Sequence, residues 1–355
     1  MVAEADEYET IKETLTRILG DKYKRDIRIT EFLSEEIRNW KHCTVSRLYL
    51  KIYPRDEITV IIKQFNPETN DEKIMVLQKV LGHILSGEDI APEFYGTVCE
   101  VDRGRYWVFM EDLGKNLVKG KSDWIREDIE HCLGFVEKFA KIHLLFLENE
   151  ELLRKHIHFS DIPRARSDWY NSCNFAIRGV LDNVNKVMQT GKFPWIDEII
   201  DDFSCIPEPC FPIVDSLMPY LSFSWTHADK SPDENMIIGC EGEKPVYYFI
   251  DWDDIVFVPV LDDLAGFLDF GRDLTDELTI VSRYWECVQG SSLLPFPKEE
   301  CLTTYMYFKL INSVRCIHYQ AGRLAQKNFR DDWHEQVLQR TLPTSIKLAN
   351  ELKII

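Results

Sequence analysis

Short apolar runs of strand character occupy most of the first 110 or so residues of this chain. The runs are short, rich in β-branched and aromatic residues, and separated by polar or turn-forming residues, which favours β-strands. They lie at residues 26–33, 44–52, 59–65, 94–101 and 106–110. The third run, TVIIKQF, is apolar except for Lys63. A lysine of this kind is common on an edge strand, where its charge prevents aggregation.

Apolar residues at helical spacing predict two helices within this strand-rich part. Residues 3–19 carry Ile11, Leu15 and Ile18 on one face, so we expect an exposed helix that Gly20 ends. A wider apolar stripe in residues 71–85 predicts a second helix.

From about residue 117 onward the pattern is mostly helical. A long stripe from Ile129 to Leu144 predicts one helix, with His143 at its edge in a structural role. After Asp251 the pattern predicts helices to the end of the chain, at residues 274–288, 299–325 and 332–352. Residues 151–220 contain many prolines and predict helices with long connections.

One small hairpin interrupts the helical part. Residues 236–238 form a short apolar run that Gly239 ends, and residues 246–250 form a second, β-branched and aromatic run. The order of elements indicates an α+β fold with an antiparallel sheet first and helices after it. We therefore divide the chain into residues 1–110, a short crossing segment at 111–116, and a helical part at 117–355 that carries the hairpin.

Composition and charge narrow the possible partners. Of the 355 residues, 45% are hydrophobic, which is enough for a real core, and the net charge is −18. Nucleic acids and anionic membranes bind basic patches, so this balance argues against both as partners, while it permits a cationic substrate. No apolar run approaches the roughly 20 residues of a membrane helix.

The ten cysteines are scattered, with no C-x-x-C pair, and we interpret them as free thiols in a reducing cytoplasm. The acidic N-terminal residues, MVAEADEYE, do not resemble a signal or transit peptide. A cytoplasmic location is the expectation.

The hairpin predicts a group of oxygen donors at one of its ends. Asp229 and Asn235 precede its first strand and Asp251 follows its second. Carboxylate and amide oxygens suit Mg²⁺ bound together with phosphates, because that ion takes few protein ligands and leaves the rest of its shell to substrate and water. The alternative for each residue alone is a solvated polar position beside a turn.

At these residues the chain resembles the aminoglycoside phosphotransferase family, the small-molecule branch of the protein-kinase-like fold. The family carries H-G-D-x-x-x-x-N, an apolar strand, I-D-W and then D-L-A. The matching segments here are 227–229 (HAD), 235–238 (NMII), 250–252 (IDW) and 263–265 (DLA), with Lys63 in the position of the family's strand lysine. The resemblance covers about residues 25–270 and implies a two-lobed protein-kinase-like fold with an antiparallel-sheet N-lobe and a mostly helical C-lobe.

The resemblance implies a role for each of five residues in Mg²⁺-dependent phosphoryl transfer from ATP or GTP. Asp229 is the catalytic residue beside the acceptor hydroxyl, Asn235 and Asp251 hold Mg²⁺, Lys63 binds the nucleotide phosphates, and Glu72 fixes the lysine side chain.

The same resemblance makes residues 106–114 (YWVFMEDLG) the hinge that holds adenine, through the backbone of Glu111 and Leu113. His227 braces the catalytic loop, and Asp263 supports that loop from the following helix.

Three departures from the family pattern matter. Ala228 replaces the family's glycine, and five residues instead of four separate Asp229 from Asn235, so Glu234 or Asp233 is an alternative metal ligand. No glycine occurs between Gly20 and Gly82, and the segment expected to cover the phosphates, residues 34–43 (SEEIRNWKHC), is polar and bulky.

D-F-G at 269–271 lies in a run of helical pattern, and we treat it as coincidence.

The acceptor is inferred from charge alone. Residues 251–277 contain nine acidic residues and one basic residue, Arg272, which suits a cationic, aminoglycoside-like acceptor or a solvated face. Trp225 and Trp285 are candidates for stacking on a sugar or cation, or for the core. The alternatives are a kinase for choline, a sugar or an amino alcohol, and a pseudokinase-like nucleotide-binding module with little turnover.

Overall fold

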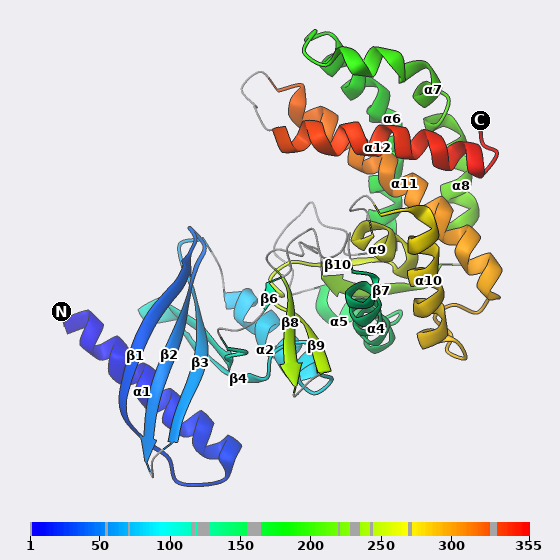
Figure 1. Cartoon of the computed structure of the whole chain (residues 1–355). Coiled ribbons are helices and arrows are strands. Elements are labelled where there is room, and N and C mark those ends of the chain that lie inside the picture. Colours follow the sequence, from blue (N-terminus) through cyan, green and yellow to red (C-terminus); the bar gives the residue numbers. More distant parts are fainter. Residues whose placement is uncertain are drawn as a thin grey trace. The chain divides into compact units, whose positions relative to one another are not determined.

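The computed structural model describes residues 2–53, 56–69, 72–114, 118–119, 128–154, 165–218, 221–227, 235–241, 244–268, 272–326 and 332–355. The chain forms two compact units (Figure 1). Unit 1 comprises residues 1–120, 155–159 and 231–254, and unit 2 comprises residues 121–154, 160–230 and 255–355. The predicted α+β class is confirmed, with an antiparallel sheet in the N-terminal part and mostly helices in the C-terminal part.

A five-stranded antiparallel sheet forms the centre of unit 1. Its strands are β1 (Arg28–Asn39), β2 (Cys43–Tyr53), β3 (Asp56–Phe65), β4 (Phe94–Glu100) and β5 (Arg105–Glu111), in the order β1-β2-β3-β5-β4. A short 3-10 turn, η1 (Val101–Arg103), joins the last two strands along the chain. Each strand overlaps a predicted apolar run, but β1 continues to Asn39, six residues past the predicted 26–33 and into the segment expected to cover the phosphates. β3 has neighbours on both sides, so the edge-strand interpretation of Lys63 is wrong.

Helix α1 (Val2–Tyr23) packs on one face of this sheet. Leu15 and Leu19 are fully buried in a cluster with Leu48 and Val60 of the sheet. The helix also continues past Gly20, so the sequence-based expectation of an exposed helix ending there is wrong on both counts. Burial of a leucine side chain contributes about 1.5–3 kcal/mol, which makes α1 part of the unit's core.

Helix α2 (Glu72–Ser86) lies between β3 and β4 in the chain and agrees with the predicted 71–85. The hairpin is also confirmed, as β8 (Met236–Glu241) and β9 (Lys244–Phe249), with β6 (Val118–Lys119) alongside β8. The backbone N–H of Phe249 donates to the carbonyl of Ile90, 2.8 Å away, just before β4. The hairpin therefore packs with the sheet in unit 1, whereas the sequence division placed it with the helices.

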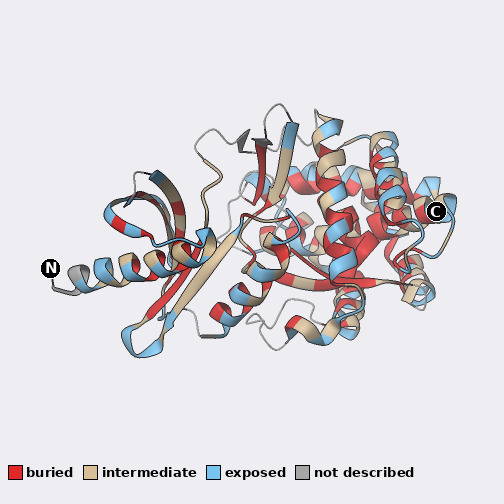
Figure 2. Ribbon diagram, turned by 90° about the horizontal axis from the view of Figure 1, so that it is seen from below, coloured by how far each residue is buried: buried red, intermediate tan, exposed pale blue. Residues whose placement is uncertain are grey.

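Unit 2 is mostly helical. Its elements are α4 (Ile129–Leu145), α5 (Glu150–Arg154), α6 (Arg166–Met188), η2 (Pro194–Glu198), α7 (Ile200–Ser204), α8 (Pro207–Leu217), α9 (Val260–Phe267), α10 (Leu274–Val288), α11 (Lys298–Leu324) and α12 (Asp332–Glu351). Buried residues occur both in the strands and in the helices (Figure 2). Along α11, buried positions recur every three or four residues, and this helix contacts α6, α9 and α12. The three predicted C-terminal helices agree with α10, α11 and α12 within one residue at each end.

One strand pair stands among these helices. β7 (Phe223–His227) pairs antiparallel with β10 (Ile255–Pro259). The prediction of continuous helix after Asp251 is therefore wrong at residues 255–259, where a short apolar run forms a buried strand. Within the described residues, no helix is long and apolar enough to cross a membrane.

Candidate functional site

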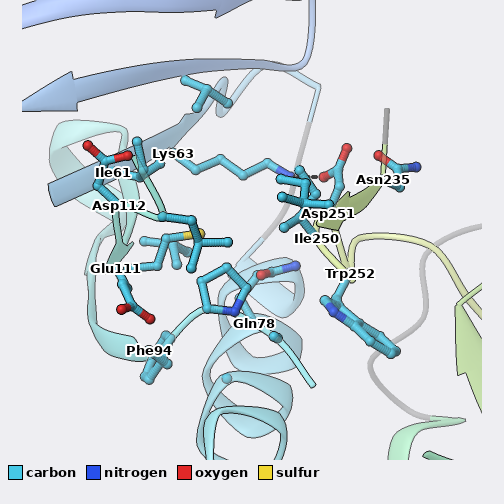
Figure 3. Close-up of a pocket in the computed structure, with 18 of the residues that line it drawn as sticks. Ile61, Lys63, Gln78, Phe94, Glu111, Asp112, Asn235, Ile250, Asp251 and Trp252 are labelled. Carbon is cyan, nitrogen blue, oxygen red and sulfur yellow. Dashed lines mark hydrogen bonds and ion pairs between the residues drawn. The ribbon is translucent and has the colours of Figure 1, made fainter. Parts of the chain in front are cut away.

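A cavity of about 430 Å³ lies in unit 1 (Figure 3). It is on the face of the sheet opposite α1. Side chains alternate between the two faces of a strand, so Val60 and Ile62 of β3 point into the α1 core while Ile61 and Lys63 line the cavity. Cross-strand register then places Val45 and Val108 directly beside Lys63. The cavity is large enough for a small-molecule ligand, and its walls are mainly apolar.

Lys63 is nearly buried and bonds two carboxylates. Its Nζ donates to Asp251 and, at 2.5 Å, to Asp253. Burial acts to lower the pKa of Lys63, but the charges of Asp253 and Asp251 outweigh it and hold the pKa above its ordinary value. The lysine is therefore a fixed positive charge at the cavity wall.

The hairpin brings Asn235 and Asp251 to the same cavity. Met236 pairs with Phe249 in the β8–β9 register, so the residues just outside this pair, Asn235 and Ile250, lie side by side. The Ile250 N–H donates to the Asn235 carbonyl at 2.9 Å. Figure 3 shows the Lys63 side chain reaching Asp251, with Asn235 next to it.

Asp251 has a left-handed backbone, with φ of 65°. This conformation is uncommon outside glycine and costs roughly 1–2 kcal/mol, so the surrounding structure must hold it. Asp251 lies just after Ile250, the first residue beyond β9, and its carboxylate is 33% exposed and lines the cavity. Such strain at a cavity wall is typical of a functional position.

These side chains fit a magnesium ion. Asp251 supplies a carboxylate and Asn235 an amide oxygen, both hard donors, at a cavity that a nucleotide would share. Mg²⁺ needs only one or two such protein ligands because phosphate oxygens and water complete its shell. The alternative ligands Asp233 and Glu234 lie outside the described residues.

The predicted hinge forms another wall of the cavity. Residues 111–114 line it, among them Glu111 and Leu113. Glu111 is held at both its backbone and its side chain, since its N–H donates to the Glu93 carbonyl at 2.8 Å and its Oε2 accepts from the Glu93 N–H at 3.1 Å. This segment is therefore fixed at the end of β5.

Arg47 and Asp112 reinforce the hinge from the neighbouring strand. They form two parallel hydrogen bonds of 2.6 and 2.9 Å, and Asp112 Oδ1 also accepts from the Gly114 N–H at 3.0 Å. Burial acts to raise the pKa of Asp112, but the hydrogen bonds from Arg47 and Gly114 outweigh it, and the pKa lies below its ordinary value. The pair fixes the loop after β5 against β2.

The turn between β1 and β2 has no glycine and is held by backbone hydrogen bonds. The Trp40 N–H donates to the Cys43 carbonyl at 2.8 Å, and the Asn66 N–H donates to the His42 carbonyl at 2.9 Å. Arg38 lies over the Trp40 ring, 5.3 Å from its centroid, and both line the cavity. The segment expected to cover the phosphates therefore places the side chains of Arg38 and Trp40 at the cavity.

The part that Asp253 and Gln78 play beside Lys63 was missed in the sequence. Asp253 accepts from Lys63 and, through its Oδ1, from Gln78 Nε2 of α2 at 2.7 Å. Burial raises the pKa of Asp253 to about 7, although Lys63 opposes the shift. The W-D-D sequence after Asp251 was the available signal for Asp253; Gln78 carried none, because its partner is 175 residues away in the chain.

Several predicted residues are placed only in part. Asp229 lies outside the described residues, as do residues 269–271. Glu72 is the first residue of α2, but its side chain lies outside what the structure describes. Their predicted roles stay predictions.

The neighbourhood of His227 is described within unit 2. His227 is fully buried at the end of β7. The preceding residue, Thr226, donates to Asp263 Oδ2 at 2.9 Å, and His143 Nε2 lies 3.0 Å from the same oxygen. His143 also contacts the Tyr284 hydroxyl at 2.7 Å. Asp263 thus fixes β7 just before the predicted catalytic loop, and His143 has the structural role that we expected.

Three of the nine acidic residues that suggested a cationic acceptor are used inside the protein. Asp262 pairs with Arg315 at 2.8 Å, and Glu277 pairs with Lys309 at 2.5 Å. Together with Asp263 these carboxylates are buried, so they offer no open acidic surface. Trp225 is likewise in the core, and its indole N–H donates to a backbone carbonyl.

Comparisons with known proteins identify no family. No protein-family model matches the chain. No curated protein matches it in sequence. Among solved structures it is similar to one described as "Structure of the microcompartment-associated aminopropanol kinase", with 12% identity over 90% of this chain and 92% of that chain and a TM-score of 0.47. A likeness this distant carries no argument about activity.

Proposed function

We propose that this protein is a small-molecule kinase that transfers the γ-phosphoryl group of ATP or GTP to a hydroxyl of a small acceptor. One observation carries the proposal: Lys63, Asn235 and Asp251 meet at one cavity whose opposite wall is residues 111–114. Phosphoryl transfer needs a cation to bind the phosphates, hard oxygen donors to bind a metal and a fixed loop to bind the nucleobase.

Most of the catalysis in such a site is positioning and charge neutralisation. Lys63 contacts the phosphates, and the backbone of Glu111 and Leu113 binds the nucleobase. Mg²⁺, held by Asn235 and Asp251, supplies charge neutralisation at the phosphate oxygens when bound.

Asp229 orients the acceptor hydroxyl and takes its proton. The acceptor oxygen forms a bond to the γ-phosphorus while the bond from that phosphorus to the β–γ bridging oxygen breaks, and the nucleoside diphosphate leaves with the electron pair. Asp229 later releases the proton to solvent. Glu72 has the proposed role of orienting Lys63, and Asp263 keeps the end of β7 in place.

The acceptor class is a small alcohol. Because Asp262, Asp263 and Glu277 are paired and buried, the acidic stretch offers a polyamine such as an aminoglycoside fewer open carboxylates than the sequence suggests. A singly charged or neutral acceptor, such as an amino alcohol, choline or a sugar, fits the remaining charges equally well. The turn at Trp40, which is held by hydrogen bonds and has no glycine, favours a second candidate function, that of a nucleotide-binding module with little turnover.

Turnover against a panel of acceptors tests the proposal. We expect Mg²⁺-dependent nucleotide consumption with at least one amino alcohol, sugar or hydroxy amino acid. Asp229→Ala should lower kcat on that acceptor by about 10²–10⁴-fold, the usual contribution of a general base, and leave nucleotide affinity within about twofold. Full turnover by Asp229→Ala would show that another residue is the base. Nucleotide binding with no turnover on any acceptor would favour the binding module.

A further inference from the structure

We propose that Asp253, held by Gln78, is a positioning residue that keeps Lys63 in place when Asp251 turns to the metal. The inference rests on the proposed function and assigns a separate task to each of the two carboxylates that Lys63 contacts.

The two carboxylates differ in where they lie. Asp251 is 33% exposed and lines the cavity, whereas Asp253 is 17% exposed and is absent from the cavity lining among the residues described. Both accept from the same Lys63 ammonium. Asp251 is therefore the one that a ligand in the cavity can reach.

Asp253 is fixed by a second element. Its Oδ2 takes the Lys63 bond, and its Oδ1 takes the bond from Gln78 Nε2 at 2.7 Å. Gln78 is itself buried in α2 and lines the cavity (Figure 3). With both oxygens in hydrogen bonds and the amide donor supplied by a helix, Asp253 has a defined orientation that does not depend on Asp251.

This arrangement resolves a competition within the site. A carboxylate that coordinates a metal ion has less charge to offer a neighbouring ammonium, so Asp251 alone cannot both hold Lys63 and bind Mg²⁺ well. With Asp253 present, Lys63 keeps one carboxylate when the other is taken. Without it, the ammonium and the metal compete for the same oxygens.

The test is a nucleotide-binding titration of the full-length protein at several MgCl₂ concentrations. Asp253→Asn keeps the side-chain size and removes the charge. We expect a rise on the order of tenfold in the MgCl₂ concentration at which the gain in ATP affinity reaches half of its maximum. One negative charge within a few ångströms of Lys63 is lost, and Lys63 then competes with Mg²⁺ for Asp251. Metal-free ATP should bind as well as before or better, since one repelling carboxylate is gone.

Two further variants keep the test independent of folding. Gln78→Leu leaves every charge in place and removes only the tether, so we expect a smaller rise in the MgCl₂ requirement. Asp56→Asn makes the same chemical change at a carboxylate that pairs with Arg25 in the same unit, and should change nothing.

A purely structural role for Asp253 predicts a different pattern: equal losses of ATP affinity with and without metal. That result, or an unchanged MgCl₂ requirement in Asp253→Asn, would overturn the inference and leave the proposed function intact. Failure of the unmodified protein to bind ATP in any metal-dependent way would instead contradict the proposed function, and this inference with it.

Discussion

At the scale of single residues, Lys63 is the centre of the site. In sequence only a resemblance singles out this lysine, and the structure adds its position on a central strand and its two carboxylate partners. Its burial is tolerable because Asp251 and Asp253 compensate the charge. Removing it should therefore affect stability as well as nucleotide binding.

Lys63→Met should lower the free energy of unfolding by about 3 kcal/mol at neutral pH, the low end for breaking a buried ion pair, because Asp251 is partly exposed. The substitution leaves two carboxylates facing each other without a cation. Urea unfolding would measure the loss, and Lys63→Met combined with Asp253→Asn should recover part of it. An unfolding free energy equal to that of the unmodified protein would show that the pairs contribute nothing.

The Arg47–Asp112 pair predicts a pH dependence. The pKa of Asp112 is lowered in the folded state, since hydrogen bonds from Arg47 and Gly114 outweigh its burial. The unfolded chain then binds the proton more tightly, so the pair's contribution to stability is present above the ordinary pKa of about 3.9 and is lost as pH falls through the lower folded value.

Asp112→Asn should therefore be less stable than the unmodified protein at neutral pH, and the difference should shrink below about pH 4. Urea unfolding at a series of pH values would follow this difference. A gap that stays constant from neutral to acidic pH would mean that ionisation of Asp112 does not contribute.

Site residues could be predicted from the sequence where neighbouring elements bring them together. Asn235 and Asp251 flank a hairpin, and the pairing of its two strands brings them together as expected. Gln78 and Asp253 could not be found this way. Their hydrogen bond joins α2 to Asp253, which is far away in the sequence. Neither the hydrophobic pattern nor the local spacing of residues predicts a contact between such distant positions.

At the scale of elements, most strands and helices follow from hydrophobic period. The differences have local causes. Gly20 does not end α1, because a glycine costs only roughly 1 kcal/mol inside a helix and Lys22, in the turn that follows, bonds Glu93. The run at residues 255–259 pairs with β7, and a short apolar run of this kind does not by itself distinguish a strand from a buried helix.

The packing of α1 gives a direct test at this scale. Leu15→Ala should lower the free energy of unfolding by about 2–5 kcal/mol, because the side chain is fully buried in the cluster that α1 shares with the sheet. Glu13→Ala, on the exposed side of the same helix, should change it by no more than about 0.5 kcal/mol. Urea unfolding of both variants compares them; equal, small effects would mean that α1 is not part of the core.

At the scale of the whole molecule, the chain contains two compact units with different parts of the proposed chemistry. Unit 1 has the cavity, Lys63 and both proposed metal ligands, and unit 2 has β7, which leads toward Asp229. The order of segments along the chain placed Lys63 in the sheet-containing part, but it placed the hairpin and the two proposed metal ligands with the helices. Their packing with the sheet depends on contacts such as the one between Ile90 and Phe249.

The central claim is that the unit 1 cavity binds a nucleoside triphosphate together with Mg²⁺. Isothermal titration of the unmodified protein with ATP and with GTP, in the presence and absence of MgCl₂, measures this most directly. We expect one site per chain, with at least one nucleotide binding in the micromolar to millimolar range usual for enzyme substrates and more tightly with MgCl₂ than without it. Absence of saturable, metal-dependent binding of either nucleotide at millimolar concentration would contradict the account.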